Sequence, residues 1–365
     1  MTIWSSAHLE QTTRRRARLA AGADDDALLA AARGPRQKMA ALLASARVRE
    51  QRPMPDSWHA FLDAQRRRVD LYARTVDLVR DDVPGVRVVK GASIASHYPH
   101  GLLRGAGDVD LWCPTPDDRW AAARRLRGAG WYVTALTVFA RGTAPEEVLV
   151  SLRTDALGGD HPPGLTLATT HVATNPWAPP VRLPPSSPRV IDLACVVAEQ
   201  WEQGVRTRDI LDQHLLTRAF TADEHRALDV ALAHAGMRHL HVRLRAAAAA
   251  HLDDARPSRS GGARTDAARQ AARVVRHHLR PARVVARALA PTVDVDRGRV
   301  LDLVADRFHA HGGTARAMRA GRPAFGVPVD ERTVPVPAVE HRQDRSFLHS
   351  PLGTFRLVVG SCLDD

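Results

Sequence analysis

The chain has 365 residues, of which 44% are hydrophobic and 25% charged, a composition typical of a globular protein with about two or three domains. It shows no membrane-spanning run and no signal-peptide pattern, and its three widely spaced cysteines fit neither a disulfide framework nor a zinc knuckle, so we expect a cytoplasmic protein. A formal charge of +12 favours an acidic partner, nucleic acid or nucleotide phosphates.

Residues 1–80 predict an N-terminal helical region. Ala, Leu and Arg dominate it, with turn signals near Gly34-Pro35 and between Pro53 and Pro55. The segment from Trp58 through Val79 has the apolar spacing of a long amphipathic helix. This helix is expected to deliver the chain to a central domain, residues 81–180.

The central domain is predicted to begin with a short strand and a phosphate-binding turn. Valines at positions 86, 88 and 89 lead into Lys90-Gly91-Ala92-Ser93, after which a helix can start. A glycine at such a turn lets a ligand approach the backbone, and the free N–H groups of a helix start favour an anion. We expect Gly91, Ala92 and Ser93 to hold the β- and γ-phosphates of a nucleotide.

The next predicted strand, Asp108 to Cys113, carries two carboxylates. Its alternation places Val109 and Leu111 on one face and Asp108 and Asp110 on the other, about 6.5–7 Å apart between Cα atoms. Such a pair suits Mg²⁺, and two ions about 3.5–4 Å apart can activate a hydroxyl while neutralising phosphates. We therefore expect Asp108 and Asp110 to be metal ligands.

Lysine occurs at only two positions, Lys38 and Lys90, although the chain has 52 basic residues. A compact ammonium at the predicted phosphate turn suits a phosphate, and we expect Lys90 and Arg104 to supply counter-charges there. Loss of Lys90 is accordingly expected to weaken nucleotide binding more than loss of Lys38.

The motifs around this turn resemble those of the DNA polymerase β-like nucleotidyltransferase superfamily. The likeness rests on Lys90-Gly91-Ala92, Tyr98-Pro99, Leu103-Arg104, Asp108-Val109-Asp110-Leu111 and Gly130-Trp131-Tyr132, with a weaker echo from Leu183 to Leu216. The pattern is most similar to that of a bacterial family described as uncharacterised nucleotidyltransferases. The resemblance implies an α+β fold, a small mixed sheet flanked by helices, and Mg²⁺-dependent transfer of a nucleotidyl group from an NTP.

Active members of that superfamily add a third carboxylate on a later strand, commonly in a Val-Asp-Leu-His-Trp-like stretch. The best counterpart in this chain is Ala168-Thr169-Thr170-His171, with Thr169 at the acidic position. A neutral hydroxyl supplies no charge, so the metal would be held more weakly. We expect Asp155, at the end of the neighbouring predicted strand, to complete the catalytic site with Asp108 and Asp110. The alternative is a two-carboxylate protein that is slow or non-catalytic.

The rest of the chain is expected to be scaffold or substrate surface. Strands are predicted at 132–140, 148–153 and 165–172, a helical domain at 181–320, and an irregular tail at 321–365 with a possible edge hairpin. One cationic stripe could contact nucleic acid or be a solvated face; it comprises Arg269, Arg273, Arg276 and Arg280.

The sequence thus predicts an Mg²⁺-dependent nucleotidyltransferase that uses two metal ions. Its acceptor stays open: a small metabolite, a peptide or protein side chain, or an RNA end. Serine-hydrolase, P-loop and dinucleotide-binding motifs are absent from the sequence. Two alternatives stay open, a non-catalytic nucleotide- or RNA-binding protein on the same fold and a toxin that modifies RNA ends.

Overall fold

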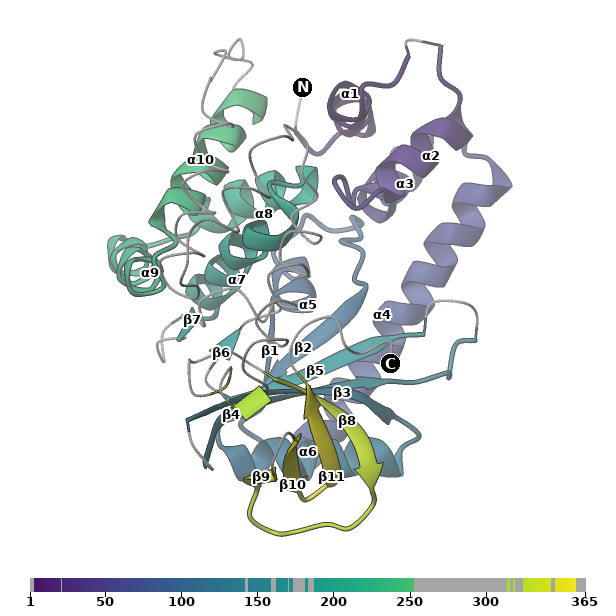
Figure 1. The fold of residues 1–365 in the computed structure, drawn as a ribbon. Helices are drawn as coiled ribbons and strands as arrows, with labels where there is room; N and C mark the ends of the chain where they lie inside the picture. The colour runs from purple at the N-terminus through teal and green to yellow at the C-terminus, as the bar shows by residue number, and fades with distance from the viewer. Residues whose placement is uncertain are drawn as a thin grey trace, which may run out of the picture.

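The chain folds into a mixed α/β structure built on one large sheet (Figure 1). This computed structural model describes residues 3–20, 22–141, 144–158, 162–169, 171–172, 181–182, 187–252, 314–315, 318, 324–342 and 345–358. Ten α-helices occur within these ranges, and nine strands form a mixed sheet in the order β1-β2-β5-β4-β3-β8-β11-β10-β9. The sheet is larger than the small one expected from the sequence.

The N-terminal region is helical, as its composition predicted. It contains α1 (Ser6–Ala17), α2 (Asp25–Arg33), α3 (Ala40–Arg49) and the long helix α4 (Asp56–Asp82). Side-chain caps start the first two helices, because the Ser5 hydroxyl accepts from the His8 N–H and the Asp24 carboxylate from the Ala27 N–H. Helix α4 then runs from this helical layer down to the sheet (Figure 1).

The central strands follow the predicted alternation. Strand β1 (Arg87–Val89) pairs antiparallel with β2 (Asp108–Trp112), and β2 pairs parallel with β5 (Gly164–Ala168). The short helix α5 (Gly91–Ala95) follows β1 and precedes β2 in the chain. Helix α6 (Pro116–Gly128) begins at a capping box made by Thr115 and Asp118. The long strands β3 (Tyr132–Arg141) and β4 (Ala144–Arg153) form an antiparallel pair, and the short strands β6 (His171–Val172) and β7 (Val181–Arg182) form a separate two-stranded sheet.

The C-terminal segment completes the sheet, where an irregular tail was expected. Its strands are β8 (Ala324–Asp330), β9 (Ala338–Arg342), β10 (Arg345–Ser350) and β11 (Gly353–Val358), and β8 pairs antiparallel with β3. The predicted hairpin is present as β10 and β11, but β8 and β9 flank it. The proline at position 328 made this segment look unlike a strand in the sequence. In the structure Pro328 pairs with Phe355 beside a register shift, a place where a sheet tolerates proline.

Two hydrophobic cores lie on either side of the central strands. The sheet core joins Val109 and Leu111 of β2 to Trp120 of α6 and to the C-terminal strands. The helical core joins α1–α4 and α5 to α7 (Pro188–Gln203), α8 (Thr207–Arg218), α9 (Ala222–His234) and α10 (Arg238–Leu252).

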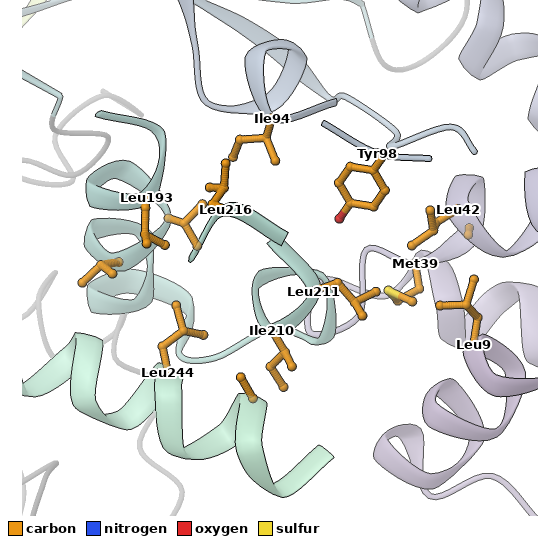
Figure 2. Packing of buried hydrophobic residues seen from close by; sticks show 14 of the residues in the cluster. Leu9, Met39, Leu42, Ile94, Tyr98, Leu193, Ile210, Leu211, Leu216 and Leu244 are labelled. Atoms are coloured by element: carbon orange, nitrogen blue, oxygen red, sulfur yellow. The ribbon is translucent and has the colours of Figure 1, made fainter. Parts of the chain in front are cut away.

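The two helical regions that the sequence predicted separately share this second core. Figure 2 shows Leu9, Met39 and Leu42 of the N-terminal region close to Leu211 of α8, with Tyr98 above them in this view. None of the described helices is long and apolar enough to cross a membrane.

Candidate functional site

Asp108 and Asp110 line a cleft of about 510 Å³ beside β2. Val109 and Leu111 are buried in the sheet core, whereas Asp108 is exposed and Asp110 half-buried on the opposite face. The cleft is also lined by the turn between α2 and α3, by α4, by the start of α5, and by the turn between α7 and α8. Its size is typical of a small-molecule site.

Lys90 stands at the end of β1 and faces Asp110 in this cleft. Its Nζ lies 3.4 Å from Asp110 Oδ2 and 3.9 Å from Glu199 Oε1 of α7. Burial would lower the pKa of Lys90, but Asp110 and Glu199 outweigh it and raise the pKa above the usual value. Lys90 is therefore a buried cation within a carboxylate-lined wall of the cleft.

The two carboxylates that contact Lys90 have opposite pKa shifts. Burial raises the pKa of Asp110 to about 7, against the opposing effect of Lys90. Glu199 is also penalised by burial, yet Arg206 and Lys90 lower its pKa to about 2. The Glu199 charge is therefore stabilised by two cations, Lys90 and Arg206. Arg206 also pairs with Asp209.

Asp192 of α7 accepts hydrogen bonds from two residues of the predicted phosphate turn, Lys90 and Ser93. Lys90 has a φ of 58°, uncommon for a residue other than glycine, and its N–H donates to Asp192 Oδ1 at 2.7 Å. The Ser93 hydroxyl donates to Asp192 Oδ2 at 2.6 Å. Of the three predicted phosphate-binding residues, Gly91 lines the cleft, whereas Ala92 and Ser93 are not among the described lining residues. Ala92 packs against the sheet core.

Arg104 also lines the cleft, but its guanidinium is committed to a structural network. It donates from Nε and Nη2 to the two oxygens of Asp212 at 2.9 and 2.7 Å, and from Nη1 to the Gly91 carbonyl at 3.0 Å. The Tyr98 hydroxyl donates to the same Asp212 at 2.6 Å. Arg104 therefore positions the Gly91 backbone, whereas the sequence predicted a counter-charge for phosphate.

The strand register shows which residue stands beside the metal-binding pair. In the parallel pairing of β2 and β5, Asp110 lies opposite Thr166 and Asp108 opposite Gly164. The neighbouring strand therefore presents the neutral Thr166 beside Asp110. Thr169 is buried elsewhere, where its hydroxyl donates to Glu147, the partner of Arg119.

Asp155 is not brought to the pair. It lies two residues beyond the end of β4, is exposed, and accepts a hydrogen bond of 3.2 Å from the Tyr132 hydroxyl of β3. Strand β3 lies on the side of β4 away from β5 and β2. The Asp155 carboxylate is therefore bonded to a strand on the far side of β4 from β2, and it does not line the cleft.

Lys38 lines the same cleft as Lys90, so both lysines of the chain reach the candidate site. It comes from the turn between α2 and α3, where its φ of 51° is also in the left-handed region. The sequence predicted Lys38 to be remote from the phosphate turn. It is therefore not the neutral comparison for Lys90 that was expected.

Sequence reasoning missed three acids from the later helices, Asp192, Glu199 and Asp212. Asp192 and Asp212 are fully buried, and each supports a predicted motif residue. A signal was present: Val190 to Val197 is apolar on all sides of the helix except at Asp192. A carboxylate in such a helix needs a buried partner, which could have been sought at the turn.

Within the described ranges, no three His, Cys, Asp or Glu side chains come together as a metal site. Asp108 and Asp110 form a two-carboxylate pair, and Mg²⁺ commonly binds through one or two carboxylates together with substrate phosphates. The arginine stripe at 269–280 lies outside the described residues. Comparison of the chain with protein-family models, curated proteins and solved structures finds no match.

Proposed function

We propose that this protein is an Mg²⁺-dependent nucleotidyltransferase whose site is the cleft beside β2. The observation that carries the proposal is the convergence of Asp108 and Asp110 with Lys90 and Gly91 on that cleft. The motif resemblance to polymerase β-like enzymes supports the same function. The acceptor is a hydroxyl or phosphate of a metabolite, a peptide or an RNA end.

The roles of the residues follow from their contacts. Asp108 and Asp110 would hold Mg²⁺, which supplies charge neutralisation to the triphosphate and activates the attacking oxygen. Lys90 is the positive charge that pairs with Asp110 in the absence of a metal. Asp192 and Arg104 fix the backbone of Lys90 and Gly91, so that the turn is already formed when nucleotide enters.

A second candidate function is nucleotide binding without turnover. It is favoured by one observation: the neighbouring strand presents the neutral Thr166 opposite Asp110, while the motif counterpart of the third carboxylate, Thr169, is also neutral. Glu199 of α7 is an acid from another segment whose charge acts on Asp110, but it is paired with Arg206 and Lys90. A protein of this kind would bind Mg-NTP in the same cleft and leave it intact.

The decisive experiment is incubation with Mg²⁺, each labelled NTP and cell extract, followed by intact-mass and RNA analysis for the adduct. The variants Asp108→Asn and Asp110→Asn should each lower label transfer by about 100-fold or more, since metal stabilisation of a transition state amounts to several kcal/mol.

Asp155→Asn is the matched control, because it removes one carboxylate outside the cleft. It should transfer label like the unmodified protein. Transfer that survives both Asp108→Asn and Asp110→Asn would rule out the metal role. Saturable binding of NTP with no transfer to any acceptor would favour the second candidate.

A further inference from the structure

Lys38 and Arg208, two neighbouring cations of the cleft, have no carboxylate ion-pair partner among the described residues. Lys90 pairs with Asp110, Arg104 with Asp212, and Arg206 with Glu199. Lys38 and Arg208 also line the cleft, and within the described ranges neither forms an ion pair. Arg208 donates from Nη1 to the Gly105 carbonyl at 2.9 Å, while its buried Nε has no hydrogen-bond partner.

The backbone holds Lys38 and Arg208 at one place. The N–H groups of Thr207 and Arg208, at the start of α8, donate to the carbonyls of Arg36 and Gln37 at 3.1 and 3.2 Å. The Thr207 hydroxyl adds a hydrogen bond to the buried side chain of Gln37. The turn before α3 is therefore hydrogen-bonded to the start of α8, and the two cations belong to one junction.

The pKa shifts of these two cations show that they lie close together and that nearby carboxylates compensate them only in part. Burial lowers the pKa of Lys38, and the nearby Arg206 and Arg208 lower it further. Burial also lowers the pKa of Arg208, with Arg104 as the next cause. Like charges held together in a cleft concentrate positive potential there, which attracts and retains an anion.

Lys38 and Arg208 line the same cleft as Asp108 and Asp110. Glu199 and Asp108 are the carboxylates that act in the opposite direction on Lys38, so Lys38 lies within electrostatic range of Asp108. A triphosphate carries more anionic oxygens than one site can bind. Its charge can be shared between a metal at the β2 pair and a second group of donors in the same cleft.

We propose that Lys38 and Arg208 form an anion subsite for the phosphoryl oxygens of a polyphosphate. This deepens the proposed function, on which it rests for the identity of the natural ligand. The phosphoryl group bound there belongs either to the triphosphate of the nucleotide or to a phosphate on the acceptor.

The test uses inorganic tripolyphosphate, titrated calorimetrically into the full chain in the presence of EDTA. Lys38→Met and Arg208→Met should each weaken its binding by about 10-fold or more, the effect of one or two charge-assisted hydrogen bonds. Arg66→Met is the matched control, because it removes one positive charge from the exposed surface of α4, outside the cleft. Lys38→Arg should retain binding.

Equal tripolyphosphate affinity in Lys38→Met and Arg66→Met would overturn the subsite, and Lys38→Met decides even if Arg208→Met is unstable. The metal-free readout is independent of turnover. If label transfer is never seen but Lys38 still governs tripolyphosphate binding, the enzyme proposal fails and the subsite stands.

Titrations of Mg-ATP and of an RNA bearing a 5′-monophosphate then identify the source of the phosphate. Weaker ATP binding by Lys38→Met identifies the nucleotide triphosphate, and weaker binding of the RNA identifies the acceptor.

Discussion

At the scale of single residues, Arg104 shows that a cation in a cleft can serve the scaffold. Its three nitrogen donors are all used, two on Asp212 and one on the Gly91 carbonyl. Both side chains of the pair are almost completely buried, with side-chain exposures of 4% and 0%. Such a bidentate pair is strong where both charges are satisfied, and removal of one partner leaves the other charge buried.

Arg104→Met should therefore lower the free energy of unfolding by about 3–5 kcal/mol, because Asp212 would stay buried without its bidentate ion-pair partner. Chemical denaturation measures this loss, and Arg66→Met, which breaks an exposed pair with Asp63, should change it by less than about 1 kcal/mol. The double variant Arg104→Met, Asp212→Leu should recover part of the loss. Additive effects of the two changes would contradict the coupling.

At the scale of elements, the segment Arg104 to Gly107 carries the chain past α3 and α4 to Asp108. A β-carbon built at Gly105 would lie 2.9 Å from the Ala41 Cβ and 3.1 Å from Gln65 Oε1. One built at Gly107 would meet no atom within 4 Å. Close approach of backbone to two helices thus requires glycine at the first position and does not require it at the second.

Gly105→Ala should therefore destabilise the fold by about 1–3 kcal/mol, as overpacking does in a tight contact. Gly107→Ala is the matched control two residues away and should lie within about 0.5 kcal/mol of the unmodified protein. Thermal unfolding of the two variants provides the comparison. Equal melting temperatures would show that the segment moves freely away from α3.

The sequence predicts an element well when the residues that determine it are close together in the chain. The strand with Asp108 and Asp110 is a local pattern and is present as expected. The partners of the turn could not be read in this way, because Asp192 and Asp212 lie about a hundred residues further along the chain; the sequence separations are 102 from Lys90 to Asp192 and 108 from Arg104 to Asp212.

The residue expected to complete the pair was also chosen without knowledge of distant contacts. Asp155 was chosen by its nearness in sequence, and Thr169 by a motif match, whereas strand register decides which side chain faces Asp110. The extent of the sheet was missed because β8 reaches β3 after a long separation, through a pairing that no local pattern encodes.

At the scale of the whole molecule, α5 and α7 connect the two cores. Ile94 of α5 belongs to the helical core, and Ile191 and Cys195 of α7 pack with Val89 of β1 in a small third cluster. Asp192 lies at this junction, fully buried, and its carboxylate holds both the Lys90 N–H and the Ser93 hydroxyl. The protonation of one group therefore affects how stably the helical core and the sheet are joined.

Burial raises the pKa of Asp192 to about 7, above the value of 3.8 that is usual for an exposed carboxyl. Between about pH 4 and 7 the folded protein keeps a proton that the unfolded chain releases, so stability falls as the pH rises through this window.

The variant Asp192→Asn has no titrating group at this position. Its amide can still accept from the Lys90 N–H and contact the Ser93 hydroxyl. The variant should therefore gain stability relative to the unmodified protein as the pH rises from 4 to 7, by up to about 4 kcal/mol at pH 8. Denaturant unfolding across this range measures the difference, with the exposed Asp70→Asn on α4 as control. A constant difference between Asp192→Asn and the unmodified protein from pH 4 to 8 would show that Asp192 does not titrate in this window.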